Sequence, residues 1–125
     1  MANTPEPRAV AEAQAKLAQR RAELARLTAQ VDFQVQDTYE QVRETERSLK
    51  LYEETAIPKA RENVRLARVA YANAKVPFLN LIDAQRSLVE LLDREFELRA
   101  ELRRRRAALD RAVGASADRP DARIP

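Results

Sequence analysis

The polar residues best placed to do chemistry lie near an interruption in an otherwise helical pattern, between Tyr71 and Asp83. Asn80 and Asp83 are three positions apart, so on a helix both side chains lie on one face. Asp83 lies near the start of the predicted return helix, where a carboxylate interacts favourably with the helix dipole and can pair with Arg86.

A second candidate is a run of four arginines, Arg103 to Arg106. Such a run can indicate nucleic acid or anionic lipid as a partner. On a helix, however, the four side chains spread over every face, and Glu101 and Asp110 lie within one turn for ion pairing. No aromatic residue is interleaved to stack on bases. We interpret the run as a solvated helix end and expect no nucleic-acid partner.

Catalysis has no support among the residue types. The sequence contains no His and no Cys. The usual nitrogen and sulfur ligands of zinc and copper are therefore missing, and no Ser lies in a plausible nucleophile and base arrangement. The net charge of +3 is too small to indicate a polyanionic partner. We expect a protein that is not an enzyme and holds no metal and no cofactor.

The composition predicts long helices. Charged residues make up 34% of the chain, aromatic residues 5%, and there is a single glycine. Apolar residues recur every seven positions, which is typical of coiled coils; the lines are Val10, Leu17, Leu24, Val31; then Val35, Val42, Leu49, Ala56; then Ile57, Val64, Tyr71. No apolar run is long enough to span a membrane, and the first ten residues lack the apolar core of a signal peptide. The chain by itself is expected to be soluble.

The predicted fold is all-α: a long kinked helix and a shorter antiparallel return helix that form a coiled-coil hairpin. Residues 1–7 are a polar lead-in, and the first helix covers about 8–73 with a kink near Pro58, which lacks a backbone donor. The tip is 74–77, where Pro77 pushes Val76 into an extended conformation. The return helix covers about 78–113 and ends at Gly114, before a disordered tail, 114–125.

The return helix is expected to be apolar on more than one side. Leu81, Leu88, Leu102 and Leu109 form one line, and Leu91 and Leu98 form another. A two-helix hairpin buries one face of each helix. Additional apolar faces therefore predict self-association or further helices.

Residues 51–114 resemble the second half of a repeat in the TolC-type outer-membrane efflux proteins, and most closely their heavy-metal and cation branch. The resemblance consists of a Pro-containing helix, a Tyr, a tip, an apolar pair, an Asp-Ala-Gln-Arg motif and a long helix that closes on Gly. The matching positions are Pro58, Ala60, Tyr71, Phe78, Leu79, Asp83, Ala84, Gln85, Arg86, Leu109 and Gly114.

The resemblance implies a periplasmic α-helical barrel segment of an outer-membrane efflux duct, a passive conduit in a tripartite efflux system. Family members are trimers in the outer membrane and periplasm, and they reach the membrane only through parts absent from this chain. Asn80 and Asp83 would line the pore, where Asp83, repeated by symmetry, would form an acidic ring that favours cations at the entrance. Tyr71 would donate a hydrogen bond to a neighbouring hairpin. The tip that contacts the periplasmic adaptor would consist of Asn73, Ala74, Lys75, Val76 and Pro77.

Other interpretations stay open beside these. The tip can be an ordinary interhelical turn, and Tyr71 can be a packing residue in line with Ile57 and Val64. The whole chain can be a soluble self-associating coiled-coil module. The sequence also departs from the family at Ala74, where the family tip normally has Gly. Either the turn differs or Asn73 takes the left-handed backbone conformation.

Overall fold

The computed structural model describes residues 4 and 6–115, and it divides into two units between Asp37 and Thr38. The described part of the first unit is a single helical segment, the beginning of α1 (Pro7–Leu51). Pro7 is the first helical residue, a position where a missing backbone donor costs nothing. The predicted lead-in falls largely outside the described residues.

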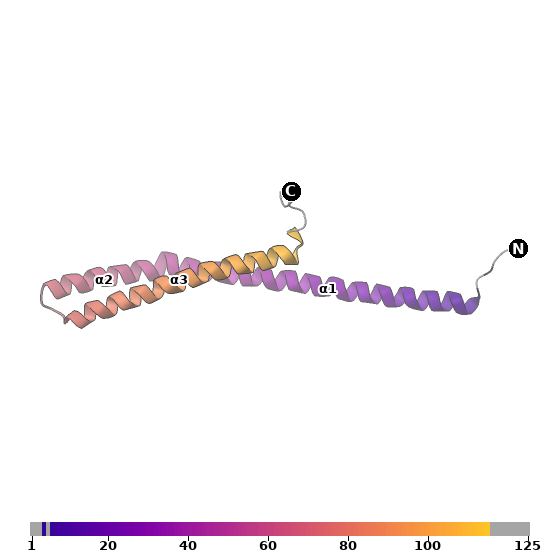
Figure 1. Cartoon of the computed structure of the whole chain (residues 1–125), viewed down its shortest axis with the longest axis horizontal. Coiled ribbons are helices and arrows are strands. Elements are labelled where there is room, and N and C mark those ends of the chain that lie inside the picture. The colour runs from indigo at the N-terminus through magenta and orange to yellow at the C-terminus, as the bar shows by residue number, and fades with distance from the viewer. Residues whose placement is uncertain (1–3, 5, 116–125) are drawn as a thin grey trace, which may run out of the picture. The chain divides into compact units, whose positions relative to one another are not determined.

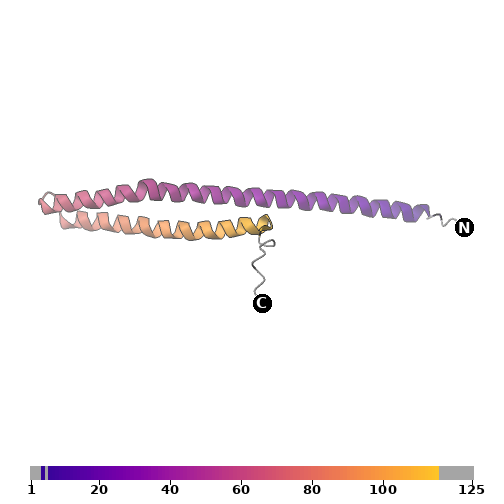
Figure 2. The same cartoon turned by 90° about the horizontal axis from the view of Figure 1, so that it is seen from above.

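The second unit contains the hairpin. It begins with the last part of α1 and continues through η1 (Tyr52–Ala56), a π-helical turn, into α2 (Ile57–Ala72). The chain then reverses, and α3 (Phe78–Ala112) returns antiparallel beside α2, η1 and the end of α1 (Figures 1 and 2). The predicted all-α hairpin is confirmed.

The two arms meet along one apolar seam. The first arm contributes mainly Val42, Thr45, Ile57, Ala60 and Val64, which are all buried. In α3, every residue at alternating steps of three and four is buried or half-buried. These residues are Leu81, Ala84, Leu88, Leu91, Glu95, Leu98, Leu102, Arg105, Leu109 and Ala112. This spacing is a heptad repeat, so the arms pack as a coiled coil.

The seam corrects one expectation from the sequence. Leu81 and Leu88 were assigned to a different apolar face from Leu91 and Leu98. In the structure, the two lines are alternate positions of one seam and face the same partner arm. They are the two apolar positions of a heptad, which lie only about 50° apart around the helix. They therefore give no argument for further helices.

The π-helical turn explains why the apolar line shifts in the first arm. Its seam advances in steps of three or four up to Tyr52, then by five to Ile57, and then by three and four again. A π turn contains one residue more than an α turn, so η1 absorbs the extra position. The Ile57 amide donates to the Tyr52 carbonyl, five residues back. The interruption thus lies one turn before Pro58, which occupies the first turn of α2.

The return helix ends at a left-handed glycine. Gly114 has φ +76°, and its amide donates to the Arg111 carbonyl at 3.2 Å. A left-handed residue directly after a helix ends the hydrogen-bond ladder, and glycine adopts it without steric cost. The predicted disordered tail falls outside the described residues beyond Ala115.

Candidate functional site

The tip of the hairpin is a tightly hydrogen-bonded turn. The Lys75 amide donates to the Ala70 carbonyl and the Ala74 amide donates to the Tyr71 carbonyl, both at 2.9 Å. These two bonds define a Schellman motif, the common way of closing a helix C-terminus. Asn73 adds a side-chain bond, because its Nδ2 donates to the Val69 carbonyl at 2.9 Å. The last carbonyls of α2 are thereby satisfied.

Ala74 occupies the left-handed position of this motif. Its φ is +56°, and it is the one non-glycine residue of the described chain with a positive φ. The sequence left open whether Asn73 would take that conformation, but Asn73 has φ −91° and ψ 13°. The turn keeps the geometry that glycine favours, and Ala74 bears the steric strain of its Cβ.

Two aromatic rings face each other across the turn. The ring centroids of Tyr71 and Phe78 are 5.3 Å apart, with the planes tilted by 56°. Tilted rings at this distance attract one another beyond simple area burial. Tyr71 therefore has a packing role within its own hairpin. The expected hydrogen bond from its hydroxyl to a neighbouring hairpin stays a prediction.

The remaining tip residues start the return helix and present an open surface. Pro77 has an extended ψ of 155°, and its carbonyl accepts a bond from the Asn80 amide at 3.1 Å. Lys75 and Pro77 are exposed, and Val76 is half-buried. A shallow hollow on the tip is lined by Tyr71, Ala72, Ala74, Lys75, Val76 and Pro77. The five residues predicted to contact a partner thus form one continuous turn, in which all but Val76 are exposed.

Asn80 and Asp83 both lie on the exposed side of the first turns of α3. The two neighbouring leucines differ in burial: Leu81 is buried in the seam, whereas Leu79 is 64% exposed. The possible pair between Asp83 and Arg86 is not formed among the described residues. The Asp83 carboxylate therefore faces solvent and has no salt bridge to another described residue.

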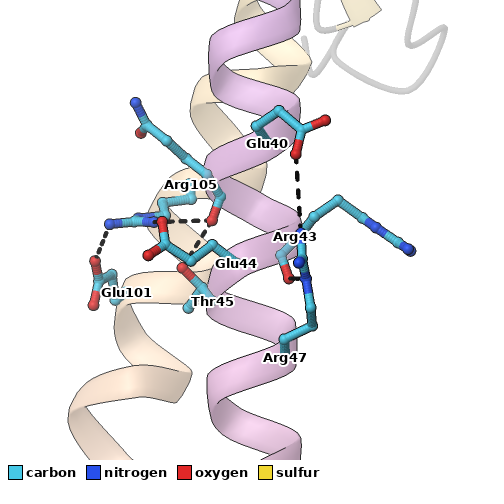
Figure 3. A network of polar contacts seen from close by, with 8 residues as sticks. Glu40, Arg43, Glu44, Thr45, Arg47, Glu101 and Arg105 are labelled. Atoms are coloured by element: carbon cyan, nitrogen blue, oxygen red, sulfur yellow. Dashed lines mark hydrogen bonds and ion pairs between the residues drawn. The ribbon is translucent and has the colours of Figure 1, made fainter.

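At the end of the hairpin opposite the tip, the two arms are joined by polar contacts around one backbone carbonyl (Figure 3). These contacts are called the polar clamp below. The Gln41 carbonyl accepts a bond from the Thr45 hydroxyl and a second one from Arg105 Nη1, each at 2.9 Å. The guanidinium of Arg105 also pairs with Glu101 on its own helix. Thr45 is the one buried polar residue among the described residues, and this bond satisfies it.

Two further ion pairs join the arms along the exposed edge of the seam. Arg106 Nη2 contacts Glu46 Oε1 at 2.8 Å, and Arg99 Nη2 contacts Glu53 Oε1 in η1 at 2.8 Å. Arg99 also binds Glu95 on its own helix. Arg106 thus pairs with a residue of the opposite arm, although Asp110 is also available one turn away on its own helix. Two of the four consecutive arginines thus serve the hairpin itself.

A local pair lies on the outer surface of α2. Arg65 donates two hydrogen bonds to Glu62, at 2.8 and 2.6 Å. These bonds hold the pKa of the Glu62 carboxyl below its ordinary value and raise the pKa of Arg65. Both groups are fully exposed, so the pair supports the helix locally and forms no site.

Three features of the molecule were not predicted from the sequence: the π turn, the salt bridge from Arg99 to Glu53, and the residues that form the second apolar side of α3. The sequence does contain a pattern that indicates the second apolar side, because Ile82, Val89 and Phe96 are spaced by seven. No pattern in the sequence indicates the salt bridge, since residues 53 and 99 meet only when the arms are in register.

No family model, curated protein or solved structure matches the chain. Among the described residues, no helix is long and apolar enough to cross a membrane. Nor does that part of the chain hold three or more acidic, His or Cys side chains grouped as metal ligands.

Proposed function

We propose that this chain forms part of the wall of an oligomeric efflux duct of the TolC type, as a helical hairpin whose tip docks to a periplasmic adaptor. The proposal rests on the resemblance of residues 51–114 to that family. Its strongest support is the position at which the chain reverses direction. The chain turns at Asn73 to Pro77, the segment at which the family motif has its tip.

The geometry of the tip supports docking by the end of the hairpin. The Schellman bonds and the contact between Tyr71 and Phe78 fix the turn before any partner arrives. A surface that is already ordered loses little conformational entropy on binding. Lys75 adds a cation at the outermost turn, and Val76 and Pro77 add apolar area.

The hairpin would contribute structure and charge to the duct, and no chemistry. Asp83 faces solvent one to two turns beyond the tip, as a pore-lining carboxylate must. Symmetry-related copies of Asp83 would make a ring that concentrates cations near the entrance. Asn80, on the same side, would add a neutral polar group. The energy of transport would come from an inner-membrane pump.

The test is conductance of a reconstituted full-length duct that carries this hairpin. The Asp83→Ala variant should weaken block by multivalent cations, because it removes one carboxylate per subunit from the entrance. Asp93→Ala is the matched control, since Asp93 is also an exposed acid of α3 but lies almost three turns further on. If both variants are blocked like the parent, Asp83 acts only on the helix start, and the ring is wrong.

A second candidate function is a self-associating coiled-coil module without a duct. It is favoured by the exposed apolar side chains of both units, which include Phe33, Leu24, Leu79 and Phe96. The two functions differ in their dependence on a partner. A duct hairpin should bind the periplasmic adaptor through its tip, and Val76→Asp should abolish that binding. A self-associating module should assemble equally well with or without the substitution.

A further inference from the structure

A second apolar stripe runs along α3 beside the seam. This outer stripe consists of Phe78, Ile82, Val89, Leu92 and Phe96. All its members except Phe78 follow a seam residue by one position, which turns them by about 100° around the helix. Phe78, Val89 and Phe96 are 53%, 55% and 72% exposed, and Ile82 and Leu92 are half-buried. The spacing in steps of three, four or seven is that of a coiled-coil surface.

The first unit carries another apolar stripe of similar length. This N-terminal stripe consists of Val10, Leu17, Leu24, Leu27 and Val31, and all five are exposed. The end of the stripe forms a shallow apolar hollow together with Thr28 and Asp32. Leucines spaced by seven on an exposed helix are a strong signal for a helical partner.

The two stripes lie in segments of opposite charge. Residues 8–31 contain five basic and two acidic side chains, which gives a net charge of +3. Residues 78–96 contain two basic and four acidic side chains, which gives −2. Opposite charges beside apolar stripes favour pairing of unlike helices, whereas like charges disfavour pairing of each stripe with itself.

We propose that the N-terminal stripe of one copy packs against the outer stripe of a second copy. Each chain carries both surfaces, so a second copy supplies an apolar partner of matching period and opposite charge. Pairing two N-terminal stripes would bring +3 against +3, and pairing two outer stripes would bring −2 against −2. The inference concerns the chain by itself, and it stands or falls independently of the duct.

Disulfide or maleimide cross-linking tests the contact directly, because the chain has no cysteine of its own. Leu24→Cys and Val89→Cys are placed in separate chains that carry different tags, and the chains are mixed and treated with a short bis-maleimide linker. Mixed dimers should exceed either like dimer. Both sites are exposed, so circular dichroism should give parental helicity for each variant.

The control replaces Val89→Cys by Ser87→Cys, an exposed site on the opposite side of α3. Mixing it with Leu24→Cys should give few mixed dimers, since Ser87 lies about 160° from Val89 around the helix. A preference for like dimers would overturn the proposed pairing. So would equal yields from the Ser87 and Val89 sites, or a chain that sediments as a monomer at every concentration.

Charge reversal tests the part played by the flanking residues. Arg21→Glu should weaken self-association roughly two- to five-fold, the range expected for exposed ion pairs, and added salt should weaken the parent in the same direction. Asp93→Arg in the same chain should restore part of the loss. Equal self-association of parent and Arg21→Glu, independent of salt, would overturn the electrostatic choice of partner. These measurements use no adaptor and no membrane, so their failure leaves the duct proposal to its own test.

Discussion

Ala74 shows how a single backbone angle can conflict with the residue that adopts it. The Schellman bond from the Lys75 amide to the Ala70 carbonyl requires a left-handed residue at this position, and the Cβ of alanine is crowded there. The conflict is local, since Ala74 is exposed and its side chain supports no buried contact. It can therefore be relieved by one substitution without change elsewhere.

Ala74→Gly should stabilise the hairpin by about 1 kcal/mol, because glycine adopts a positive φ without strain. Thermal unfolding followed by circular dichroism should show a higher midpoint. The matched control is Ala72→Gly, which lies in the last turn of α2 with helical geometry and should lower the midpoint. A lower midpoint for Ala74→Gly would show that the unfolded chain gains more entropy from glycine than the turn loses in strain.

Arg105 is the residue whose role depends most on the opposite arm. Its contacts with the Gln41 carbonyl and Glu101 occur at a half-buried seam position. Arg105→Met should keep the packing of the aliphatic stem but lose the charge-assisted bonds, which costs about 1 to 2 kcal/mol. Arg104→Met, at an exposed neighbouring position, should change the unfolding midpoint little. Equal midpoints for the two variants would mean that the clamp adds no stability.

At the scale of the elements, η1 sets the register of the hairpin. The seam of the first arm contains one residue too many for a continuous α-helix between Tyr52 and Ile57, and the π turn accommodates it. Pro58 fits the same place, because it lacks the donor that an uninterrupted helix would use. The π turn and the proline therefore belong to the same local interruption of the α-helix.

A deletion of Glu54 together with Pro58→Ala should be tolerated, because it converts the π turn into an α turn and leaves both halves of the seam aligned. Heteronuclear NMR shifts should then indicate a continuous helix, with an unfolding midpoint near that of the parent. The control is deletion of Glu97 in α3, where no widened turn can absorb the change. That deletion rotates half of α3 by about 100° and should unfold the hairpin. If both deletions unfold the chain, η1 does not determine the register.

At the scale of the whole molecule, the two units differ in what stabilises them. Residues 38–115 contain every buried residue of the described chain and all the ion pairs between arms. The described part of the first unit is one helix with no buried residue, and most of the stability of a helix in a protein comes from packing of its apolar face. Its order in solution should therefore depend on a partner.

A chain restricted to residues 38–115 should unfold at nearly the same temperature as the full chain under dilute conditions. Every buried residue of the described chain lies within that range, so removal of residues 1–37 takes away none of them. Native-state hydrogen exchange of the full chain should show fast exchange for residues 10–31 and slow exchange near Ile57 and Leu98. A large loss of stability in the shortened chain would show that the first unit takes part in the hairpin core.

Much of the fold of this protein could be predicted from the sequence, because the signals that specify it are local. The heptad spacing predicted the helices, the occurrence of Asn73 and Pro77 close together predicted the tip, and the single Gly114 predicted the helix end. Each of these signals lies within a few turns of the feature that it predicts. The tertiary structure decided what depends on register between distant segments. It assigned the two leucine lines of α3 to one seam, joined Arg99 to Glu53 and Arg105 to Gln41, and placed Ala74 in the left-handed conformation. The conformation of Ala74 is set by the hydrogen bonds that close α2, whereas the sequence alone left Asn73 open as the left-handed residue. The seam and the contacts between the arms depend on how the two arms align, and no stretch of sequence contains both sides of such a contact.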